Sequence, residues 1–169
     1  PEFACIILIS SNENIILNTI KSRCMKLKFK GIEDKILYDY AIENLGYENI
    51  SNNLLKTFDG SIGKAIELKE NKEYFEQIDA LISNFKTDDI ISIFLASKFM
   101  YDKEKIFVFL DYLTVALYEN AKIDKRYLNC LKYVNNTIQR LNRNGNFNMN
   151  IDDLLLNIWE ELNEKSIRN

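Results

Sequence analysis

The sequence predicts a mainly α-helical protein in which two short β-like segments are confined to the first thirty residues. Only 1 proline and 5 glycines occur among 169 residues, and so few helix breakers favour helices with short connections. From residue 33 onward, apolar residues recur at spacings of three and four, which is the period of an amphipathic helix. The β-like patterns all precede that point.

The first thirty residues are expected to form a strand, a short helix and a second strand. Residues 4–10 are a continuous apolar run, typical of a strand covered on both faces of a parallel sheet. Residues 14–24 carry isoleucines at helical spacing, and residues 25–29 alternate apolar side chains with lysine, as in a half-exposed strand. Because two strands do not make a stable sheet, we expect this chain to be a fragment whose missing N-terminal part supplies the other strands.

Three short helices are expected next, between residues 32 and 72. Gly46 is a candidate C-cap for the first of them. Ser51 or Asn52 can cap the second and Ser61 the third, since their side-chain oxygens can accept a hydrogen bond from a free N–H in the first turn.

Five longer helices are expected in the rest of the chain. The stretch Thr87-Asp88-Asp89 is placed to begin the second of these, Asp102 the third and Asp124 the fourth. The asparagine-rich stretch 142–149 predicts a loop, after which Asn150 begins the last helix. The apolar stripes of these helices are wide, which fits either a buried core or a contact with another chain.

Composition excludes several kinds of site. The chain has no histidine, the commonest general base and transition-metal ligand, and no glycine-rich phosphate loop. Its net charge of −3 argues against a generally basic nucleic-acid-binding surface. Three scattered cysteines, Cys5, Cys24 and Cys130, favour a reducing, cytoplasmic setting.

Two polar stretches near the N-terminus are the candidate site. Ser10, Ser11 and Asn12 follow the first apolar run, and ligands of open α/β sheets bind at the carboxyl ends of strands. An ordinary helix-capping loop would look the same. Arg23 lies at the end of the short helix, where a cation also interacts favourably with the helix dipole.

Read together, the apolar strand, the polar turn and the short helix ending in Ser22-Arg23-Cys24 resemble the AAA+ clamp-loader family of bacterial DNA polymerase III. In that family this triplet carries an arginine finger that reaches the ATP of a neighbouring subunit. The resemblance implies that Arg23 is catalytic in trans and that Ser22 and Cys24 support its turn. It also assigns the sensor-1 region to Ser10, Ser11 and Asn12.

A second motif lies at residues 60–65, Gly-Ser-Ile-Gly-Lys-Ala, which resemble the lid-helix motif of the same family. ATP-hydrolysing members carry a sensor-2 arginine there, whereas this chain has Gly63, followed by Lys64. The resemblance therefore implies a non-hydrolysing subunit that needs no cofactor in this part of the chain. The ATP would be bound by a neighbouring subunit.

The resemblance also implies a domain plan and partners. Residues 1–31 would be the C-terminal remnant of the AAA+ ATPase domain, 32–72 the helical lid and 73–169 a helical collar for oligomerisation. The partners would be the gamma/tau and delta subunits in a hetero-pentamer, and through that complex the sliding clamp and primer-template DNA. The chain would thus not be catalytic by itself but would belong to the DNA polymerase III holoenzyme, a nucleotidyltransferase.

Two alternatives stay open at this point. The chain could come from an ATP-hydrolysing clamp-loader subunit of the gamma/tau type. It could also be a helical protein-interaction module unrelated to ATP, with Arg23 only a structural cation at a helix end.

Overall fold

The computed structural model describes residues 5–10, 13–87 and 89–167, the last four without their side chains. The chain divides into two compact units, one ending at Lys30 and the other beginning at Gly31. The described residues are mainly helical. Within these ranges, no helix combines the length and the apolar character needed to cross a membrane.

The first unit contains two short helical pieces and, among its described residues, no strand. The 3₁₀ turn η1 spans Glu13–Ile15 and α1 spans Asn18–Lys21, so the helix expected over 14–24 is divided in two. Residues 5–10 and 25–30 are irregular, and the two expected strands are not formed there. A strand needs a hydrogen-bonded neighbour, and no β-ladder joins the two described segments.

The second unit is helical throughout. Three helices, the longest of 12 residues, come first, and five follow, with 3₁₀ turns at two connections. In chain order these elements are α2 (Asp34–Leu45), α3 (Asn52–Thr57), α4 (Ile62–Leu68), η2 (Lys69–Asn71), α5 (Lys72–Asn84), α6 (Ile90–Ala96), η3 (Lys98–Tyr101), α7 (Ile106–Ala121), α8 (Arg126–Asn142) and α9 (Phe147–Ile167).

Four of the expected helix ends are confirmed. Gly46 ends α2 in the left-handed region, at φ 67°, which costs glycine little. The hydroxyls of Ser51 and Ser61 each accept a hydrogen bond of 3.2 Å from the backbone N–H three residues onward. Within the expected stretch 87–89, Asp88 lies outside the described residues, and the Asp89 carboxylate accepts two backbone N–H groups in the first turn of α6.

Three other helix starts differ from the expectation. Asp102 does not cap α7 directly but accepts the backbone N–H groups of Glu104 and Lys105, in the turn before that helix. Asp124 lies two residues before α8 and accepts the N–H of Arg126, the first residue of that helix. The last helix begins at Phe147, because the side-chain oxygen of Asn146 accepts the N–H of Met149 at 3.1 Å. The predicted loop 142–149 was therefore too long at its C-terminal end.

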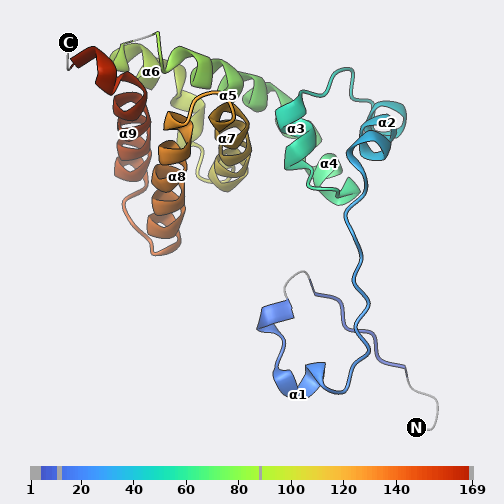
Figure 1. Ribbon diagram of the computed structural model, residues 1–169. Coiled ribbons are helices and arrows are strands. Elements are labelled where there is room, and N and C mark those ends of the chain that lie inside the picture. Colours follow the sequence, from blue (N-terminus) through green and yellow to red (C-terminus); the bar gives the residue numbers. More distant parts are fainter. Residues whose placement is uncertain (1–4, 11–12, 88, 168–169) are drawn as a thin grey trace. The chain divides into compact units, whose positions relative to one another are not determined.

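A single hydrophobic core runs through the second unit. Helices α7, α8 and α9 lie side by side, α3 and α5 pack against α7, and α6 packs against α9 (Figure 1). Phe58, which follows α3 directly, Phe109 of α7 and Ile158 of α9 are all completely buried in this core. The expected division between residues 72 and 73 into lid and collar stays a prediction.

Candidate functional site

A one-turn helix and the turn after it position Arg23. The N–H of Ser22 bonds to the carbonyl of Asn18, and the N–H of Arg23 bonds to that of Ile20, both at 3.0 Å. The Ser22 hydroxyl donates a further hydrogen bond of 3.1 Å to the carbonyl of Thr19. These bonds extend the helical path beyond α1 and hold Arg23 two residues past its end.

The Arg23 side chain is exposed and has no hydrogen-bond or ion-pair partner in the described part of the chain. In particular, no hydrogen bond joins its guanidinium to the free carbonyls at the end of α1. A guanidinium offers five donors in a planar fork that matches carboxylate and phosphate oxygens. In this unit the group is therefore free to bind an anion supplied from outside.

The surroundings of Arg23 are strongly basic. Among the described residues up to Lys30 there are five basic side chains and one acidic side chain, Glu13. Glu13 forms an ion pair with Lys26. The pKa of Glu13 is lowered by the hydrogen bond from Lys26 first, and then by the charges of Lys26, Lys28 and Lys21. Glu13 is thus neutralised locally, and the remaining cations among the described residues favour an anionic partner.

A hollow of about 470 Å³ lies within this unit. It brings together some of the residues that the sequence singled out: Ser10 and Cys24 line it, with Lys21. Ser22 and Arg23 are not among its lining residues. Ser11 and Asn12 lie outside the described residues, so Ser10 is the one residue of the expected sensor-1 region that the structure describes.

Residues 60–65, for which a lid-helix motif is expected, lie in the second unit. Gly63 is exposed in the first turn of α4, and a Cβ there would make only an ordinary contact, 3.6 Å from the Ser61 hydroxyl. The position could therefore hold a side chain, but it carries none. The Lys64 ammonium lies 3.7 Å from the carboxylate of Asp59, and both side chains are solvent-exposed.

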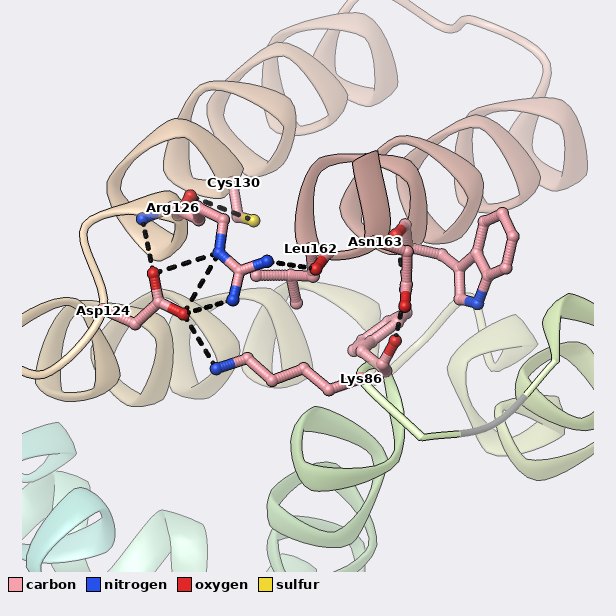
Figure 2. Close-up of polar contacts among 8 residues, drawn as sticks. Lys86, Asp124, Arg126, Cys130, Leu162 and Asn163 are labelled. Atoms are coloured by element: carbon pink, nitrogen blue, oxygen red, sulfur yellow. Dashed lines mark hydrogen bonds and ion pairs between the residues drawn. The ribbon is translucent and has the colours of Figure 1, made fainter. Parts of the chain in front are cut away.

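One polar cluster was not found from the sequence. Figure 2 shows the Asp124 carboxylate between two cations, 2.9 Å from the Lys86 ammonium and 2.8 Å from an Arg126 guanidinium nitrogen. Arg126 also donates to the carbonyl of Leu162 near the C-terminal end of α9, and the Asn163 amide donates to the carbonyl of Phe85 at the end of α5. The cluster thus joins the ends of three helices.

The charges in this cluster compensate one another. Its two cations compensate the carboxylate between them and lower the pKa of Asp124, the hydrogen bonds from Arg126 contributing most and those from Lys86 next. Burial raises the pKa of the neighbouring Cys130 thiol to about 12, which keeps it protonated and unreactive at neutral pH. Asp124 and Arg126 are two residues apart, but Lys86 and Leu162 are distant in sequence, so no local pattern signals the cluster.

In the described ranges no three histidine, cysteine or acidic side chains gather closely enough to hold a metal ion. Comparisons of the chain with protein-family models, with curated proteins and with solved structures found no match. The resemblance to the clamp-loader family therefore rests on the motif residues alone.

Proposed function

We propose that this chain is the C-terminal part of the delta-prime subunit of the bacterial DNA polymerase III clamp loader. In this proposal the subunit hydrolyses no ATP of its own and presents Arg23 to the ATP bound by a neighbouring gamma/tau subunit. The complex would be a cytoplasmic hetero-pentamer with the delta subunit, which loads the sliding clamp onto primer-template DNA during replication. Residues 32–72 would act as the lid and residues 73–169 as the collar that holds the pentamer together.

The observation that carries the proposal is the free guanidinium of Arg23 on a turn fixed by backbone hydrogen bonds. In phosphoryl transfer, negative charge spreads over the phosphate oxygens, and an arginine supplied in trans accelerates the reaction by roughly 10³–10⁵-fold. Such an arginine must be exposed and must not be committed to a partner in its own chain. Arg126 and Arg140, by contrast, are both paired with carboxylates.

The test is Arg23→Ala in the complete subunit, assembled with its partner subunits. We expect clamp- and DNA-stimulated ATP turnover to fall at least tenfold while the assembly stays intact. Arg23→Lys should recover little, because lysine keeps the charge but loses the planar fork. Arg143→Ala is the matched control, since Arg143 is also exposed but lies in the α8–α9 loop. Unchanged turnover in an intact Arg23→Ala assembly would refute the finger role.

Within the family, a gamma/tau-type subunit is the nearest alternative. Tight ATP binding by the isolated complete subunit would favour this alternative, if another cation of the chain took the place of the sensor-2 arginine. The glycine at position 63 argues for delta-prime, because no cation occupies the position that the family motif gives to the sensor-2 arginine.

A helical interaction module unrelated to ATP is the second candidate. It is favoured by exposed apolar residues on the helical unit, such as Ile91 and Leu95, which lie one turn apart on α6 and are 69% and 60% exposed. Light scattering of the complete protein mixed with the clamp-loader subunits separates the two readings. Stable association supports the clamp-loader proposal, whereas no association supports the unrelated module.

A further inference from the structure

The three short helices and the following five are connected covalently through one short link, η2 (Lys69–Asn71). A single connection by itself leaves two packed parts able to rotate against each other. The structure shows a crevice of about 300 Å³ where these parts meet, lined by residues of the α2–α3 loop, α3, α5 and α7. Packing across the boundary is therefore incomplete at this point.

A polar network crosses the boundary beside this crevice. The hydroxyl of Tyr112, on α7, donates a hydrogen bond of 2.6 Å to one carboxylate oxygen of Asp79 on α5. The other oxygen of Asp79 accepts a bond of 2.9 Å from the amide of Asn53 on α3. The Ser51 hydroxyl, which caps α3, lies 3.3 Å from the Tyr112 oxygen. Two residues of the short-helix part thus meet two residues of the bundle.

The network is held in place by packing. Tyr112 is completely buried, and its ring stacks on that of Phe75 with the ring centres 4.5 Å apart. Burial and the hydrogen bond to Asp79 raise the pKa of Tyr112, so its hydroxyl keeps its proton and remains a donor. Hydrogen bonds to a carboxylate in such partly buried surroundings are stronger than those between neutral groups.

We propose that Tyr112, Asp79 and Asn53 form a latch that makes α2–α4 move as one body with the five-helix bundle. Asp79 is its centre because each of its oxygens bonds to a different part. The latch belongs to this fold whatever the chain acts on, so its test is independent of the proposed function.

Asn53→Ala tests the latch from the short-helix side, since it leaves the pair between Tyr112 and Asp79 inside the bundle intact. Hydrogen exchange of the whole chain, followed by mass spectrometry, should show about tenfold faster exchange in α2–α4 and unchanged exchange in α8 and α9. Asn129→Ala is the matched control. It removes an amide–carboxylate hydrogen bond of 2.7 Å between α8 and α9, and it should leave α2–α4 unaffected.

Tyr112→Phe is the second variant, because it keeps the stacked ring and removes only the hydroxyl. Its hydroxyl reaches the short-helix part through Ser51, 3.3 Å away, and holds the Asp79 carboxylate that Asn53 bonds to, so exchange in α2–α4 should rise, by less than in Asn53→Ala, while α8 and α9 stay unchanged. Unchanged exchange in α2–α4 for both variants would overturn the latch. Equal acceleration in α2–α4 and in α8–α9 would also overturn it, because the network would then contribute only to global stability.

Discussion

Replacing Asp124 by alanine should destabilise the helical unit by about 2–3 kcal/mol. The carboxylate accepts the backbone N–H of Arg126 at 3.1 Å, which resembles a helix-capping bond worth about 1 kcal/mol. It also pairs with Lys86 and Arg126, and each partly exposed ion pair contributes up to about 1 kcal/mol. The Asp124 side chain is only 21% exposed, which places these pairs toward the upper end of that range.

The loss of stability on removing Asp124 is limited because neither cation is then buried away from water. The side chains of Lys86 and Arg126 are 36% and 34% exposed, so water can solvate both after the carboxylate is removed. A fully buried charge without a partner would cost more, about 3–5 kcal/mol. The geometry therefore predicts a clear but not disabling loss, and the variant should still fold.

Urea unfolding at pH 7, followed by the fluorescence of the single tryptophan, measures this loss. The midpoint should fall without a change in the urea dependence. Asp153→Ala is the control, because the pair between Asp153 and Arg140 is about half exposed on both sides and should contribute only about 0.5 kcal/mol. If Asp124→Ala lowers the free energy of unfolding by no more than Asp153→Ala does, the cluster does not stabilise the contact between the helix ends.

Three further predictions follow from single positions. Because folding lowers the pKa of Asp124, its carboxylate contributes fully to the free energy of unfolding above about pH 4, and this contribution is lost as the pH falls through the lower folded-state pKa. On acid titration, Asp124→Asn should therefore lose less stability than the parent chain. In urea unfolding, Gly60→Ala should destabilise the protein by more than about 1 kcal/mol, since φ is +69° and a Cβ would lie 2.6 Å from the Gly31 Cα. Gly63→Ala should instead stabilise it by about 0.5–1 kcal/mol, because a Cβ on α4 would make only an ordinary contact with the Ser61 hydroxyl. Thiol titration at pH 8 should label the two exposed cysteines quickly and Cys130 only after denaturation, and rapid labelling of all three would contradict the buried thiol.

Much of the helical framework could be predicted because its signals are local. Ser51, Ser61 and Asp89 cap helices through bonds to N–H groups two or three residues away, and Gly46 ends a helix through its own backbone freedom. The start of α9 was misplaced because several asparagines compete for that role. Only the geometry identifies Asn146 as the side chain that bonds to the first turn.

The candidate site was predictable in part. The sequence marks Arg23 as a cation near the end of a short helix, and the structure places it in the turn after α1. The sequence could not show that the Arg23 guanidinium is unpaired among the described residues. Ion pairs can join residues from different elements, as Glu13 and Lys26 do, and no local pattern says which cation finds such a partner. The two expected strands failed for a related reason, because a strand depends on hydrogen bonds to a neighbour that a sequence pattern does not supply.

The sequence by itself determined where several helices begin or end and which side chains near the N-terminus could meet an anion. These properties depend on residues within about four positions of one another, which is the range of a helical turn. The tertiary structure alone decided that Asp124 lies between Lys86 and Arg126 and that Tyr112 meets Asp79 and Asn53. Those contacts join helices whose relative positions are set by burial of the common core, which is non-directional and leaves no local sequence pattern.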